Sequence, residues 1–302
     1  MTQKSAKILG LSGGILGLGL LINQEALPRS QPQVQSEFLE ELPNADAIGV
    51  YFWAGRLENP PEGLLPTGQQ LLEDIGTSQV RVTLSSRSDV DYQKGGCIAD
   101  FSLAALAQRE DFEAIFRDPA FNVIMITAFD GVSFPDCSSK HYLDPAFYTE
   151  PNTAAMEREY EELARYLGNF SDKIFFVSNW EGDHELYCGQ AFGATPSRCP
   201  TYLQSLEAFR KWITARTNGI RRAQASNVYS VVEFNIVNYL WDQGFPSVLY
   251  DVIPFTPADY YSYSSYESIN ALYGGDDGTQ IRTDLSRIQQ VLSDAGRNPG
   301  NL

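Results

Sequence analysis

The sequence predicts an α/β fold of the TIM-barrel type, with about six of the eight strand–helix units of a (β/α)8 barrel present. Short apolar runs rich in β-branched and aromatic residues alternate with helical patterns from residue 46 onward. Such alternation is typical of a parallel sheet with helical crossovers, and strands that are apolar almost throughout indicate burial on both faces. A doubly wound nucleotide-binding sheet is the alternative. It is disfavoured because residues 54–57, after the first predicted strand, read Ala-Gly-Arg-Leu and form no glycine-rich phosphate-binding turn.

The predicted elements follow one another in order. The apolar runs that predict strands lie at residues 48–53, 80–84, 122–127, 173–178, 228–234 and 259–263. The helical patterns lie at residues 68–75, 103–117, 153–167, 202–223, 247–253 and 281–295. In the helix at 202–223, Leu206, Phe209 and Ile213 fall at i, i+3 and i+7, which is a helix stripe. Residues 295–302 read as a helix stop and a turn where a seventh strand is expected, so we expect an incomplete barrel.

The N-terminal residues indicate export. Lys4 and Lys7 precede an apolar run of roughly 15 residues, which is the form of a signal peptide and shorter than a membrane-spanning helix. No small-x-small cleavage site follows Ile22, so residues 1–23 are expected to be either a signal peptide or an uncleaved anchor. A buried apolar helix is the alternative, disfavoured by the glycines in the run. Residues 24–45, with Pro, Gln and Ser, are expected to be a linker, and residues 46–302 the partial barrel domain. We therefore expect a protein that is periplasmic, extracellular or anchored to a membrane and facing outward.

The four cysteines fit an exported protein. Cys97, Cys137, Cys188 and Cys199 contain no Cys-x-x-Cys pair, so a zinc-ribbon or thioredoxin-like site is unsupported. An even number of cysteines in an exported chain suggests two disulfides. We expect Cys188 to pair with Cys199, which is close in sequence, and Cys97 to pair with Cys137. Four free thiols remain the alternative.

Charge and motifs exclude several classes of function. The formal net charge is -16 and the isoelectric point about 4.5, so the surface repels phosphate backbones and we expect no nucleic-acid partner. A neutral ligand such as a sugar is compatible with it. Serine hydrolase, Walker and dinucleotide-binding motifs are absent from the sequence. Asp183, His184 and Glu185 match no zinc signature because position 188 is a cysteine, so a solvated acidic loop is expected there and neither metal nor cofactor.

The densest polar cluster follows the fourth predicted strand. Residues 177–185 read Val-Ser-Asn-Trp-Glu-Gly-Asp-His-Glu. In a barrel, active-site residues lie at the C-terminal ends of the strands and in the loops that follow them. Glu181 lies next to Trp180, and partial desolvation there would raise the pKa of its carboxyl group and suit it to act as a general acid.

At these residues the sequence resembles the large clan A of retaining (β/α)-barrel glycoside hydrolases. The resemblance covers the barrel rhythm from residue 46, Asn179 and Glu181 after the fourth strand, Arg81 on the second strand, and the tyrosine-rich sixth strand. It implies that Glu181 is the acid/base and that Asn179 binds the sugar hydroxyl next to the scissile bond. It also implies that a tyrosine of the sixth strand hydrogen-bonds the nucleophile, for which we choose Tyr263 over Tyr261 and Tyr266. The sequence departs from the clan in two ways.

The first departure is that Trp180 separates Asn179 from Glu181, whereas the clan has them adjacent. Residues two apart in an extended backbone share a face, so both side chains can still point into the barrel. The second departure is that the clan's nucleophile ends the seventh strand, which is absent here, so the resemblance assigns no nucleophile.

Other candidate site residues follow predicted strands. Trp53 and Trp180 could stack on sugar rings or pack in the core. Arg87 could contact substrate or form a surface salt bridge. Asp130 follows the third strand, and Glu233, on the fifth, is either part of the site or a structural partner of Arg81.

Three functions follow from these residues. The first is an exported glycoside hydrolase that acts on an extracellular or cell-wall glycan with retention of configuration. The second is a non-catalytic carbohydrate-binding protein or inactive truncated barrel. The third is an unrelated barrel enzyme that uses Glu233 together with Glu181.

Overall fold

The computed structural model describes residues 50–51, 63–189 and 199–302. Six parallel strands form one sheet in sequence order, and each strand pairs with the next along the chain. The strands are β1 Val50–Tyr51, β2 Gln79–Leu84, β3 Val123–Ala128, β4 Ile174–Ser178, β5 Val228–Phe234 and β6 Tyr260–Tyr263. A doubly wound sheet reverses its strand order, whereas this order is that of a TIM-type barrel. The predicted α/β fold of this type is confirmed for the described residues.

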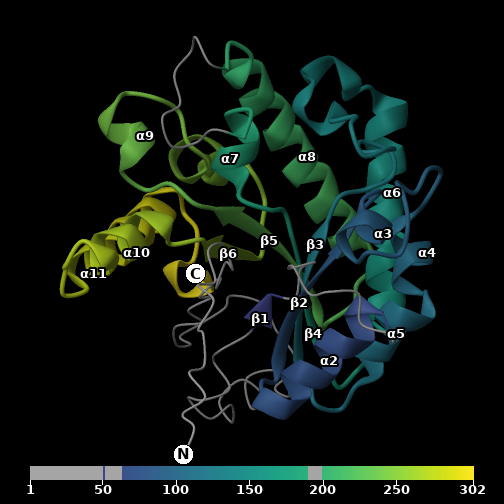
Figure 1. The fold of residues 1–302 in the computed structure, drawn as a ribbon. Coiled ribbons are helices and arrows are strands. Elements are labelled where there is room, and N and C mark those ends of the chain that lie inside the picture. Colours follow the sequence, from purple (N-terminus) through teal and green to yellow (C-terminus); the bar gives the residue numbers. More distant parts are fainter. Residues whose placement is uncertain (1–49, 52–62, 190–198) are drawn as a thin grey trace, which may run out of the picture.

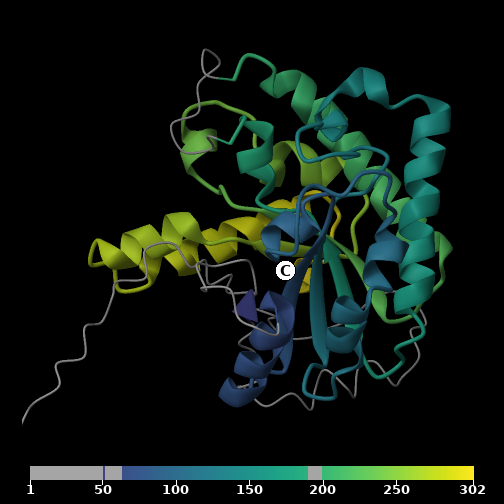
Figure 2. The same ribbon diagram turned by 45° about the vertical axis from the view of Figure 1, so that its right-hand side comes forward.

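Helices connect the strands (Figure 1). Before β4 they are α2 Leu64–Ile75, α3 Ser88–Asp91, α4 Leu103–Ala107, α5 Glu110–Arg117 and α6 Glu150–Leu167. After β4 they are α7 Gly182–Leu186, α8 Tyr202–Arg222, α9 Tyr239–Asp242, α10 Tyr266–Tyr273 and α11 Thr279–Asp294. Figure 2 shows α10 and α11 side by side, reaching away from the sheet.

Two predicted helices differ from the observed ones. The helix expected at 103–117 is divided into α4 and α5, because Arg109 between them has an extended backbone with ψ 141°. Acidic residues in the first turn of α5 favour a new helix start there. The helix expected at 247–253 is a short π-helical turn, η4 Val248–Val252, followed by a 3-10 turn. The helix α10 had no counterpart in the sequence prediction.

The two faces of the sheet have different neighbours. Alternate strand residues such as Val82, Ile126 and Phe175 pack against residues of α2, α5 and α6. Residues of β5 and β6 on the same face pack against α8 and α11. On the opposite face, the described apolar cluster contains strand residues alone, including Phe176, Tyr229 and Tyr260. Because successive residues of a strand point to opposite faces, this second set corresponds to the interior of the barrel type.

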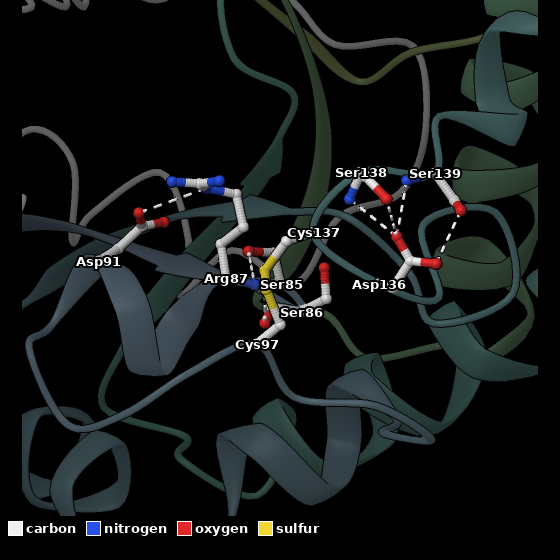
Figure 3. The surroundings of a disulfide bond; sticks show 9 residues. All are labelled: Ser85, Ser86, Arg87, Asp91, Cys97, Asp136, Cys137, Ser138 and Ser139. Atoms are coloured by element: carbon white, nitrogen blue, oxygen red, sulfur yellow. Dashed lines mark hydrogen bonds and ion pairs between the residues drawn. A yellow bond between two sulfur atoms is a disulfide. The ribbon is translucent and has the colours of Figure 1, made fainter.

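Two disulfides join loops on this framework. Cys97 pairs with Cys137 and Cys188 pairs with Cys199, which confirms the expected pairing. In Figure 3 the first disulfide joins the segment after β2 to the loop after β3, beside Ser86 and Arg87. The backbone oxygen of Ser86 accepts a hydrogen bond from the Ile98 N–H at 2.8 Å, which holds the part of the segment next to Cys97 against the end of β2.

Removing the Cys97–Cys137 disulfide by a double Cys→Ser change is expected to lower the free energy of unfolding by about 2–4 kcal/mol, because it frees a long loop in the unfolded chain. The two cysteines are separated by 40 positions, against 11 for Cys188 and Cys199. Removing the Cys188–Cys199 disulfide, which closes the shorter loop, should therefore lower the free energy of unfolding by about 1 kcal/mol less. Urea unfolding of both variants measures this, and an equal or reversed order would contradict loop closure as the cause.

Candidate active site

Glu181 lies just past β4, at the residue that precedes α7. Its backbone has φ 31° and ψ 67°, a left-handed conformation that is uncommon for a residue with a side chain. The next residue has to be glycine, because a Cβ at Gly182 would lie 2.7 Å from the Glu233 backbone oxygen and 2.9 Å from Val248 Cγ2. The Glu-Gly pair thus lets the turn after β4 approach β5 closely, and this turn holds Glu181 at the C-terminal end of the sheet.

The environment of Glu181 favours its protonated form. The residue is 6% exposed, and its Oε1 atom accepts a hydrogen bond from the Tyr266 hydroxyl at 2.7 Å. Burial raises the pKa of Glu181 to about 7; the Tyr266 hydrogen bond opposes this rise and the charge of Glu233 adds to it. A carboxyl group with such a pKa holds a proton near neutral pH and can release it there.

Glu233 of β5 lies directly behind Glu181. Its Oε2 atom is 2.5 Å from Arg81 Nη2 of β2, which is the ion pair expected from the sequence. Its Oε1 atom accepts hydrogen bonds from the Ser264 hydroxyl at 2.8 Å and the Glu181 N–H at 3.3 Å. Glu233 is 1% exposed, so a ligand does not reach it in this conformation.

Asn179 joins β4 to β5. Its Nδ2 atom donates to the Glu233 backbone oxygen at 2.8 Å, and its Oδ1 atom accepts from the Glu233 N–H at 3.1 Å and from Arg216 Nη2 at 3.3 Å. The side chain has no exposed surface. The structure therefore places the amide that we expected to bind a sugar hydroxyl inside the protein, where it fixes the end of β4 relative to β5.

The tyrosine that contacts Glu181 is Tyr266. Tyr263, which we chose as the tyrosine that bonds the nucleophile, has its hydroxyl on the helix side of β6 instead. The Tyr263 hydroxyl donates to Asp284 Oδ2 of α11 at 3.1 Å and lies near the Ser268 hydroxyl at 3.3 Å. The physical reason is strand alternation: Tyr261 and Tyr263 belong to the face that packs on the helices, whereas Tyr260 packs inside the sheet. Tyr266 starts α10, past the end of β6, and its side chain reaches the site from there.

A cavity of about 340 Å³ opens over the ends of β2, β3 and β4, and Trp180, next to Glu181 in the chain, belongs to its lining whereas Glu181 does not. Its walls include Trp180, Arg87 and Glu185. Glu185 Oε2 accepts hydrogen bonds from Lys140 Nζ at 2.8 Å and from the Tyr142 hydroxyl. Arg87 lines the cavity and also lies 3.5 Å from Asp91 in an ion pair, so the expected salt bridge is present and contact with substrate stays a prediction (Figure 3).

Of the two remaining expected site residues, the structure describes only Asp130. Asp130 has no exposed surface; its Oδ2 atom accepts from Trp212 Nε1 at 2.9 Å, from the Tyr160 hydroxyl at 3.2 Å and from the Ser133 hydroxyl at 2.8 Å. It therefore joins β3 to α6 and α8 within the core. Trp53 lies outside the residues that the structure describes.

The segment after Glu181 is no solvated acidic loop, and that expectation is wrong. Asp183 has no exposed surface, and Glu185 is 5% exposed. The Asp183 carboxylate accepts hydrogen bonds from the backbone N–H groups of Asn235 and Ile236 at 3.0 Å each and of Val248 at 2.7 Å. A carboxylate that binds free backbone donors can be buried, and a sequence alone does not reveal those donors. Within the described residues, His, Cys, Asp and Glu side chains form no group of three that could hold a metal ion.

Among the residues of the cavity wall that sequence reasoning missed are Lys140, Tyr142 and Glu185, of which the first two donate hydrogen bonds to the third. Lys140 and Tyr142 lie in a loop more than 40 positions before Glu185, and no pattern in the sequence connects them. Glu185 itself could have been found from its spacing, because it lies four residues after Glu181. The structure shows the corresponding helical hydrogen bond, from the Glu185 N–H to the Glu181 backbone oxygen at 3.1 Å.

Three buried carboxyl groups make the stability depend on pH. Burial raises the pKa of Glu159 and of Glu181 to about 7 and that of Asp183 to about 6. The folded protein then binds more protons than the unfolded chain, so this contribution is present below the unfolded pKa values and is lost as the pH rises through about 6–7. We expect a higher Tm at about pH 5 than at about pH 8 by calorimetry. The difference should shrink in Glu159→Gln, and an equal or higher Tm at the higher pH would contradict it.

None of the helices in the described ranges has the length and apolar character of a membrane-spanning segment. No known family model matches the sequence, and no curated protein matches it either.

Two solved structures resemble this fold. One is a broad-specificity endoglucanase of the GH5-4 type from an uncultured bacterium, at 14% identity and a TM-score of 0.40. The similarity covers 76% of this chain and 62% of that one. The other is a β-glucosidase in its apo form, at 12% identity and a TM-score of 0.36, covering 65% of this chain and 53% of that one. The chain thus spans less than two thirds of either structure, and at these values we draw no functional argument from them.

Proposed function

We propose that the protein is an exported glycoside hydrolase in which Glu181 is the acid/base. The observation that carries this proposal is a largely buried carboxyl group, with a pKa of about 7, at the C-terminal end of β4. This is the end of a parallel α/β sheet at which ligands bind. A cavity lined by Trp180, the residue before Glu181, supplies room for a ligand at the same end of the sheet.

In the proposed reaction, the protonated Glu181 carboxyl transfers its proton to the glycosidic oxygen as the bond from that oxygen to the anomeric carbon breaks. The leaving sugar departs as an alcohol. The Glu181 carboxylate then takes a proton from the water that attacks the anomeric carbon, which returns the carboxyl to its starting state. Retention of configuration, which the clan resemblance implies, requires a nucleophilic carboxylate that we assign to no described residue.

The substrate class that we propose is an oligo- or polysaccharide. A cavity of about 340 Å³ is at the lower end of the range for small-molecule sites, and suits a short sugar segment. The half-buried indole of Trp180 lines it, and aromatic faces stack on sugar rings. Export is consistent with the two disulfides, because disulfides persist in oxidising compartments.

The experiment is to incubate the purified protein with a panel of cell-wall and storage glycans and measure released reducing ends. Glu181→Gln, purified in parallel, is the matched control for contaminating hydrolases. Hydrolysis by the wild-type protein alone supports the proposal. Equal hydrolysis by both proteins, or none by either across the panel, would count against it.

A carbohydrate-binding protein without catalysis is the second candidate. One observation favours it: Glu233, the carboxylate that contacts the Glu181 backbone, is buried and paired with Arg81. It predicts that glycans bind to wild-type and Glu181→Gln protein with equal affinity in calorimetry, and that Trp180→Ala weakens binding. Hydrolysis by the wild-type protein would exclude it.

A further inference from the structure

The carboxylate of Glu233 on β5 contacts residues on or just after three other strands. Arg81 reaches its Oε2 atom from β2, while Ser264, which follows β6, reaches its Oε1 atom. The third contact is the N–H of Glu181, just past β4, at 3.3 Å. Because Glu233 is 1% exposed, these protein groups, and not solvent, surround its charge.

The turn that carries Glu181 contacts Glu233 through three of its residues. The side chain of Asn179 accepts from the N–H of residue 233 and donates to its carbonyl oxygen. The Glu181 N–H donates to the Glu233 side chain, and Gly182 lies so close to the Glu233 carbonyl oxygen that no Cβ fits there. Three of the four residues that follow β4 are thus fixed by one residue of β5. A left-handed backbone at a residue other than glycine costs free energy and persists where surrounding contacts hold it.

We propose that Glu233 is the positioning residue of Glu181: it holds the left-handed turn through the Glu181 N–H, and its charge, balanced by Arg81, sets the electrostatic environment of the Glu181 carboxyl. Arg81 also donates to Thr127 Oγ1 at 2.9 Å and to the Asn179 backbone oxygen at 3.3 Å, so the cation is itself fixed by β3 and by the residue that follows β4. The inference concerns the same site as the proposed function. It rests on that function only for the catalytic meaning of Glu181.

The groups that act on Glu181 come from four elements. Glu233 of β5 and Glu185 of α7 disfavour its negative charge, whereas Arg81 of β2 and the hydroxyl of Tyr266 favour it. Changing Glu233 to glutamine removes one anion and leaves the Arg81 cation facing Glu181. The Glu181 pKa should therefore fall in Glu233→Gln. In the double variant Arg81→Gln/Glu233→Gln both charges disappear, and the pKa should return toward its wild-type value.

The first test is a ¹³C NMR titration of the Glu181 carboxyl carbon, assigned by its absence in Glu181→Gln. This readout needs no catalysis, so it separates the inference from the proposed hydrolase. We expect a fall of about 1 pH unit in Glu233→Gln and less than half of that in the double variant. An unchanged Glu181 titration in folded Glu233→Gln would overturn the electrostatic part.

The second test concerns the turn itself. It uses double variants, so it still applies if the single variant Glu233→Gln does not fold. In the uncharged background Arg81→Gln, Glu233→Gln keeps an oxygen that accepts the Glu181 N–H, whereas Glu233→Met has none. We expect amide hydrogen exchange at Glu181 to be about tenfold faster in the methionine double variant than in the glutamine one, with exchange in α6 unchanged as the control for folding. Equal exchange at Glu181 in the two double variants would overturn the positioning role.

Discussion

Changing Glu181 to glutamine is expected to lower kcat/KM on glycosides with poor leaving groups by about 10²–10⁴-fold, because glutamine cannot donate a proton to the departing oxygen. The substitution keeps the size of the side chain and an oxygen that accepts from Tyr266. The wild-type pH profile of kcat/KM should fall as the pH rises above about 7, where the Glu181 carboxyl loses its proton. That alkaline limb should be absent in the variant.

Substrates with activated leaving groups provide the control for this prediction. A nitrophenolate leaves with little protonation. The rate of glycosidic bond cleavage in the variant should therefore fall much less on aryl glycosides than on natural glycosides. An equal loss on both substrate classes indicates disturbed binding or folding, and unchanged turnover on both rejects Glu181 as the acid/base.

Changing Asp183 to alanine is expected to lower the free energy of unfolding by at least about 3 kcal/mol, because it leaves buried backbone donors without acceptors. Three N–H groups, those of Asn235, Ile236 and Val248, bind the Asp183 carboxylate between 2.7 and 3.0 Å. These bonds hold the segment after β5 and the start of η4 against α7. Urea unfolding followed by tryptophan fluorescence measures the loss.

Asp136 is the matched control for this change. Its carboxylate accepts four hydrogen bonds from Ser138 and Ser139, in a loop where water can replace them (Figure 3). Asp136→Ala should therefore shift the urea midpoint far less than Asp183→Ala. Equal shifts in the two variants would show that burial of the donors is not the cause.

The order of the strands could be predicted from the sequence because each strand is a local apolar run. Residues 80–84 and 228–234 were expected as strands and lie within β2 and in β5. The division between α4 and α5 could not be predicted, because the apolar spacing of 103–117 continues across Arg109. At the break, Arg109 Nη2 lies 2.7 Å from Asp89 of α3, a contact with another element that the local pattern does not reveal.

The candidate site was predictable in its location and less so in its contacts. Polar residues after an apolar strand marked Glu181, and a charge pair inside the sheet was expected between Arg81 and Glu233. The identity of the tyrosine was not predictable, since a shift of one residue along β6 exchanges the two faces. Tyr266 reaches Glu181 because it lies past the strand, where alternation no longer applies.

The sequence by itself determined the α/β class, the succession of strands and the place of Glu181 at a strand end, because hydrophobic periodicity and local composition encode them. The disulfide pairing was expected from the closeness of Cys188 and Cys199 in sequence, but the structure decided it. The tertiary structure alone decided that Asn179, Asp130 and Asp183 are buried structural side chains and that Lys140, Tyr142 and Glu185 form a cavity wall. The physical reason is that the use of a polar side chain depends on which backbone and side-chain groups meet it, and these come from strands and loops far apart in the chain.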